Sequence, residues 1–137
     1  MAAVSRVEVR ALTVRADRVV CELAVTPPGA QSTPALMRAL APAFPHVGEH
    51  ACVNDAGDRF ADVMERTSLA HVFEHLVVDL QARAAGPGSV FVGTSEWADS
   101  ARTRARVEVS FVDDLAALRA FKGATTALNE ALAKAAR

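Results

Sequence analysis

A long apolar segment between Thr67 and Ala85 dictates how the rest of the chain can pack. Thr67 or Ser68 can cap a helix there, and Gly86-Pro87-Gly88 would end it. Apolar residues recur around most of its circumference: Leu69, Val72, Phe73, Leu76, Val77, Val78 and Leu80. A helix of this kind is buried on more than one side. We therefore expect a central helix that other elements cover.

The same segment carries one narrow polar stripe, made of His71, Glu74, His75 and Asp79. Burying polar groups without partners costs free energy. A buried helix with such a stripe usually turns it towards a cleft or an internal polar partner. The stripe therefore marks the candidate functional site.

The order His71-Val72-Phe73-Glu74-His75 is typical of a metal site. Residues at positions i and i+4 of a helix have Cβ atoms about 5–6 Å apart, so both imidazoles can reach one ion. Glu74 borders the same face and could orient a water or take its proton. This is the H-x-x-E-H order of inverzincins. Catalytic zinc needs a third protein ligand besides the two histidines.

The sequence leaves that third ligand open. Asp79 lies at i+8 from His71, about 12 Å along the helix axis, so its direct ligation would need unusual bending. It could instead accept a hydrogen bond from the free ring nitrogen of His75. His50, on the loop before the helix, is an alternative ligand. Two further carboxylates are options: Glu96 and Glu108.

Strand signals flank the central helix on both sides. Residues 7–14 and 18–25 alternate around a short polar break, which predicts a β-hairpin. Thr33-Pro34 is a typical helix start. Residues 89–92 predict a short strand, residues 94–101 a polar loop, and residues 104–112 a longer strand.

A last helix begins at Asp113 or Asp114, and Leu115 belongs to its predicted apolar stripe. The element order is thus ββα, a loop, then αββα. Runs of two strands favour antiparallel pairing. We expect one α+β domain over residues 1–137, with about four antiparallel strands and helices on one face.

Composition narrows the classes of function. The chain is 51% apolar and 23% charged, with a formal net charge of −1, which is typical of a soluble globular protein. No broad basic excess indicates nucleic acid, and no apolar run approaches the ~20 residues of a membrane span. Two cysteines and no secretory apolar region predict a cytoplasmic protein. Cys52 could be a ligand or a redox thiol, although an isolated cysteine is more often a small buried hydrophobe.

Several short motifs together resemble the N-terminal domain of cyanophycin synthetases. They are Glu49-His50-Ala51-Cys52, Gly57, Phe60, the segment from Thr67 to His75, and Asp79-Leu80-Gln81. The resemblance covers most of the chain and is densest over residues 49–81. Full synthetases also carry an ATP-grasp and a Mur-ligase-like domain, which 137 residues cannot hold. We therefore do not expect this chain alone to synthesise the Asp–Arg polymer.

The resemblance implies a zinc-dependent hydrolase of peptide or isopeptide-like bonds. Some of those N-terminal domains cut the polymer into primers with the His-x-x-Glu-His motif. By this likeness His71, Glu74 and His75 form the active motif, with Glu74 as the catalytic base. Asp79 and His50 remain the candidates for a further zinc ligand. The partner would be a peptide-like substrate or polymer.

Other N-terminal domains of that family bind and hold the polymer. The alternative is therefore a non-catalytic binding or scaffolding module, which partners a larger ligase or self-associates as a homo-oligomer. Two departures favour it. Asp79 stands where the family usually has Glu, and Gly93-Thr94-Ser95-Glu96 stands where a basic residue often follows the strand.

Overall fold

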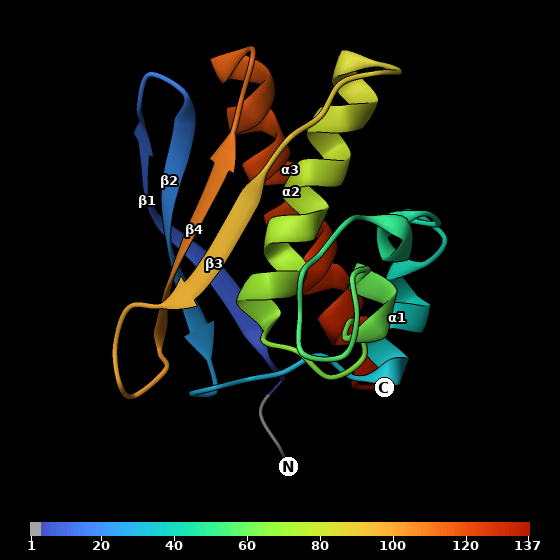
Figure 1. Ribbon diagram of the computed structural model, residues 1–137. Helices are drawn as coiled ribbons and strands as arrows, with labels where there is room; N and C mark the ends of the chain where they lie inside the picture. Colours follow the sequence, from blue (N-terminus) through green and yellow to red (C-terminus); the bar gives the residue numbers. More distant parts are fainter. Residues whose placement is uncertain (1–3) are drawn as a thin grey trace.

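A computed structural model describes residues 4–137 as a single domain with a four-stranded antiparallel sheet in the order β1-β2-β4-β3 (Figure 1). The helices and strands are β1 (Arg6–Val14), β2 (Arg18–Thr26), α1 (Pro34–Leu40), α2 (Leu69–Ala85), β3 (Gly93–Trp97), β4 (Arg104–Ser110) and α3 (Asp114–Ala135). Two 3-10 turns, η1 (Val47–Glu49) and η2 (Phe60–Asp62), lie between α1 and α2. The predicted α+β class and element order are confirmed.

The core lies between one face of the sheet and the helices. Alternate residues of the two central strands are fully buried there: Val19, Cys21, Leu23 and Val25 on β2, and Ala105, Val107 and Val109 on β4. Helix α2 packs on β3 and β4, whereas α3 packs on β1 and on α2. Phe73 of α2 meets Phe121 of α3 with ring centroids 5.8 Å apart. Burial of such a side chain contributes about 2–3 kcal/mol to stability.

Helix α2 begins and ends where its caps predict. The Ser68 hydroxyl accepts from the His71 backbone N–H at 3.1 Å. Gly86 follows the last turn with φ +88°, a conformation that suits glycine. Along its buried face the helix also holds polar residues, and Gln81 donates to the Ser110 carbonyl oxygen at 2.9 Å. No helix described between residues 4 and 137 is long and apolar enough to cross a bilayer.

The third strand lies later in the chain than predicted. Residues 89–92 form no strand, and Val90 and Val92 are 82% and 67% exposed. The strand is instead β3, which pairs with β4 from Gly93 opposite Val109 to Trp97 opposite Ala105. The prediction failed because β3 is an edge strand beside a polar site, so small and polar residues replace the usual apolar alternation.

The last helix begins as expected, with Asp113 accepting from the backbone N–H groups of Leu115 and Ala116. Leu115 itself is exposed, not part of the apolar stripe. It occupies the first turn of α3, before the helix packs under the sheet. The stripe that reaches the core starts two residues later, at Ala117.

Candidate metal centre

A tight loop presents two side chains to the polar stripe of α2. After η1 the chain turns back on itself, with Ala51 bridged to Arg59 and the Cys52 N–H donating to the Asp58 carbonyl oxygen at 3.0 Å. The Asn54 side chain closes the turn, because its carbonyl oxygen accepts from two backbone N–H groups at 2.8 and 2.9 Å. We call residues 50–60 the site loop. It holds His50 and Cys52 against α2.

Three donor atoms converge where the site loop meets the helix. Cys52, His71 and His75 each offer one ligand atom, and these atoms all lie within 4.8 Å of one another. The two Nε2 atoms of the histidines are 3.2 Å apart. The Cys52 Sγ lies 3.4 Å from the His71 Nε2. Such a group can hold a metal ion.

The spacing fits a tetrahedral ion closely. Zinc bonds of about 2.0–2.1 Å to nitrogen and about 2.3 Å to sulfur place two nitrogens about 3.3 Å apart and a nitrogen and a sulfur about 3.6 Å apart. The two distances that involve the His71 Nε2 agree with these values to within a few tenths of an ångström, and the third, between Cys52 and His75, is at most 4.8 Å. The donor set leaves a fourth position for a water or a substrate.

Hydrogen bonds on the outer ring nitrogens orient both imidazoles. The Thr67 Oγ1 lies 2.9 Å from the His71 Nδ1, and the His50 Nδ1 lies 3.1 Å from the His75 Nδ1. The His50 Nε2 in turn lies 3.1 Å from the Asp79 Oδ1. This is the pattern that fixes a metal-binding tautomer, with the free ring nitrogen engaged outside the site.

The direction of these bonds follows from Asp79. Burial works to raise the pKa of this carboxyl, but hydrogen bonds from His50 and Arg83 and their charges outweigh burial, so the pKa is lowered. An ionised carboxylate only accepts, so the His50 Nε2 donates to it. With its Nε2–H directed at Asp79, the His50 ring can accept at Nδ1 from the His75 Nδ1–H. The His75 Nε2 is left with a lone pair that faces the cluster.

Burial keeps the two histidines in the form that binds a metal. Desolvation, followed by the nearby His71 and His50, lowers the pKa of His75 to about 3, and desolvation also lowers the pKa of His71. Phe60 of η2 stacks on His75 with centroids 4.0 Å apart. Both imidazoles are therefore neutral at pH 7, as ligation requires.

Glu74 lies beside the cluster, 5% exposed, with its Oε2 3.7 Å from the His75 Nε2. Burial raises its pKa to about 7, against the opposing effects of a Ser95 hydrogen bond and the His50 charge. A carboxyl with a pKa near the working pH suits proton transfer. Strand β3 passes very close, because a Cβ on Gly93 would lie 2.8 Å from the Glu74 Cγ.

The other predicted site residues lie outside the three-atom cluster. His50 and Asp79 form the outer hydrogen-bond chain, and the Arg83 Nε donates to the Asp79 Oδ2 at 2.8 Å. Glu108 pairs with Arg18 and Arg106. Glu96 is exposed on β3. Their assignment as metal ligands stays a prediction, and the geometry favours another residue.

That residue is Cys52, which the sequence favoured as a buried hydrophobe. One signal could have identified it, namely the spacing His50-Ala51-Cys52. Positions two apart in an extended segment point to the same side, so a loop that turns His50 to the helix turns Cys52 there too. Nothing in the sequence alone fixes how the loop docks.

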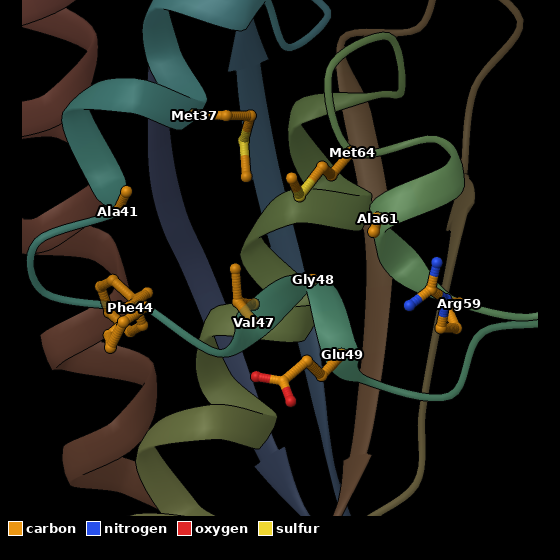
Figure 2. Close-up of a pocket in the computed structure, with 10 residues that line it drawn as sticks. Met37, Ala41, Phe44, Val47, Gly48, Glu49, Arg59, Ala61 and Met64 are labelled. Atoms are coloured by element: carbon orange, nitrogen blue, oxygen red, sulfur yellow. The ribbon is translucent and has the colours of Figure 1, made fainter.

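A cleft of about 730 Å³ opens over the cluster. The site loop forms one wall and residues 89–95 form the other, while α2 provides His71, Glu74, His75, Val78 and Ala82. A separate hollow of about 210 Å³ lies between α1, η1 and η2 and is lined by none of the cluster residues. Figure 2 shows the side chains around it, among them Met37, Phe44 and Met64. Cys52, His71 and His75 therefore belong to the larger cleft and not to this hollow.

Comparison with known proteins gives one result for the family. A family model described as the cyanophycin synthase-like N-terminal domain matches residues 18–133. The matched region contains the site loop, α2 and β3, and so the whole candidate site. A search of curated proteins gave no match.

Proposed function

The chain belongs to the cyanophycin synthase-like N-terminal domain family, and from this premise we propose that it is a zinc-dependent hydrolase of peptide or isopeptide-like bonds. The observation that carries the proposal is the convergence of one thiol and two neutral imidazoles within 4.8 Å at the base of an open cleft. Three protein ligands with a free fourth position are typical of catalytic zinc.

The proposed ligands are the Cys52 Sγ and the Nε2 atoms of His71 and His75. His50 and Asp79 act outside them, since together they hold the His75 ring in one tautomer. Partners of this kind typically change metal affinity or activity 10–100-fold when they are removed.

Glu74 is the proposed general base. Zinc, when bound, supplies Lewis acidity that makes a water more acidic and polarises an amide carbonyl. The Glu74 carboxylate takes one proton from the attacking water, whose oxygen adds to the carbonyl carbon. As the C–N bond breaks, Glu74 returns this proton to the leaving nitrogen. The second proton of the water passes from the new carboxyl group to the amine, so the products are a carboxylate and an ammonium group, and Glu74 is again ionised.

Metal analysis of protein purified without chelator tests the centre. We expect close to one zinc per chain in the natural protein. Cys52→Ala should bind zinc at least about tenfold more weakly, because one of three ligands is gone. Cys21→Ala is the matched control, since Cys21 is buried in the sheet and does not belong to the Cys52–His71–His75 cluster. Protein that folds and holds no metal would contradict the proposal and favour a non-catalytic binding module.

Glu74→Gln tests the base. The variant should keep its zinc and lose at least about a hundredfold in hydrolysis of a peptide substrate, the usual contribution of general-base catalysis. Glu49→Gln, on an exposed residue that pairs with His46, is the control and should leave the rate unchanged. Full activity in Glu74→Gln would remove Glu74 from this role.

A further inference from the structure

The edge of β3 that faces away from β4 is free to pair with another strand. The Ser110 N–H donates to the Val92 carbonyl oxygen, and the Ala98 N–H donates to the Arg104 carbonyl oxygen, both at 2.8 Å. Backbone groups alternate in an antiparallel ladder, so those of Gly93, Ser95 and Trp97 point away from β4. Among the described residues these groups have no backbone partner.

This free edge borders the cleft above the proposed zinc ligands. Gly93 and Ser95 both line the cleft, as do Glu74, His71 and His75. A peptide strand that pairs with this edge would therefore have its backbone amides next to Cys52, His71 and His75. The opposite edge of the sheet is less suited to pairing, because β1 contains a register shift between Val9 and Ala11, and such irregularities protect edges.

The rim of the cleft is apolar. Val53, Val90 and Val92 line it, and all three are strongly exposed. Exposed apolar residues that gather around one hollow mark a binding surface more often than isolated ones do. Val53 comes from the site loop and the other two from the opposite wall, so an occupant would be held between them.

The lining also lacks groups that would recognise a charged chain. Its ionisable residues are the cluster itself, His50 and Glu74; no lysine, arginine or aspartate among residues 4–137 lines the cleft. A polymer with a charge on every residue would lose hydration there without finding opposite charges. The cleft thus matches side chains that are uncharged.

We propose that the cleft binds an extended peptide with uncharged, largely apolar side chains, which adds to β3 as a further strand and so presents a backbone amide to the metal centre. Strand addition obtains affinity from main-chain hydrogen bonds and specificity from pockets for alternate side chains. This assignment of the substrate class rests on the proposed function for its chemical step, although the binding step does not require hydrolysis.

Binding is measured with zinc-loaded Glu74→Gln, in which a bound peptide stays intact. Fluorescence anisotropy compares three labelled heptapeptides: one of Val, Thr, Ala and Leu, one of alternating Asp and Arg, and the first with two alternate amides N-methylated. We expect the first to bind at least about tenfold more tightly than the others, since two lost hydrogen bonds cost about that factor. Bound peptide should also slow amide exchange at Ser95 and Trp97. Equal affinity for the charged or the methylated peptide, or unchanged exchange at the edge, would overturn the proposal.

Val90→Lys and Val92→Lys test the rim, with circular dichroism to check folding. Each should weaken binding of the apolar heptapeptide several-fold, whereas Val14→Lys, on the opposite edge strand, should not. Unchanged binding in both rim variants would overturn the proposed contact. Peptide binding without cleavage by the zinc-loaded natural protein would contradict the hydrolase and leave this inference intact. Cleavage with no preference for uncharged peptides would support the hydrolase and contradict the substrate class inferred here.

Discussion

At the scale of single residues, Glu74 combines burial with a position beside the histidines. Its folded-state pKa of about 7 lies above the ordinary value of 4.5. A raised pKa means that the buried carboxyl is stable while protonated and costs free energy once ionised. The same burial that suits Glu74 to proton transfer therefore makes it a cost to stability at neutral pH.

This cost predicts a pH dependence in metal-free protein. The contribution of Glu74 to stability is fully present below pH 4.5 and is lost as the pH rises through about 7. The free energy of unfolding of the natural protein, relative to Glu74→Gln, should fall by up to about 3 kcal/mol across this range. Urea titrations from pH 4 to 8 measure it. His75 acts in the opposite sense, between pH 3 and 6.5, but is present in both proteins. A flat difference would show that Glu74 is solvated.

At the scale of elements, the site depends on how closely β3 approaches α2. Gly93→Ala would place a methyl group 2.8 Å from the Glu74 Cγ and Oε2. Because both elements are paired and packed, we expect a loss of about 1–3 kcal/mol of stability, as in other overpacked sites, and a larger loss of activity. Thermal melts and peptide hydrolysis measure the two effects.

Two controls separate crowding from other effects of the Gly93 substitution. Thr94→Ala changes the next residue, whose side chain is exposed, and should leave stability unchanged. Glu74→Asp shortens the crowded side chain, so adding it to Gly93→Ala should recover stability. Full activity and stability in Gly93→Ala would contradict the close approach.

The sequence predicted elements well where local chemistry decides them. Helix α2 carries its own caps and its own apolar pattern, so its bounds and its polar stripe could be predicted. The bounds of β3 could not be predicted, because its pairing with β4 and its close approach to α2 at Gly93 depend on tertiary structure. The sequence ranked a ligand role for Cys52 below that of a buried hydrophobe for the same reason: its position depends on how the site loop docks against α2, and docking leaves no periodic signal.

At the scale of the whole molecule, the proposed metal would join two segments distant in the chain. Cys52 belongs to the site loop, and the histidines lie 19 and 23 residues later on α2. A ligand that binds only the folded state adds about 2.7 kcal/mol of stability at a hundredfold excess over its dissociation constant. For a domain of this size we expect a melting temperature about 10 °C higher with zinc than after chelation.

Calorimetry with and without zinc measures this shift. Cys52→Ala should reduce it, while Cys21→Ala should lower stability in both conditions and leave the shift in place. Hydrogen exchange shows where the metal acts, because chelation should increase amide exchange in residues 50–60 more than in the sheet. Equal melting temperatures with and without zinc would contradict metal binding to the folded domain.

The hydrogen-bond chain from Arg83 through Asp79 and His50 to His75 has one more consequence. It holds the His75 imidazole in its metal-binding rotamer and tautomer before any ion binds. The site is therefore preorganised, and binding does not have to order this side chain as it would in a flexible site. Capture of a metal should then be limited by its own loss of water and by deprotonation of the thiol, not by a search among side-chain conformations. In such a rigid site, selectivity between metals becomes a matter of ion radius and preferred angles.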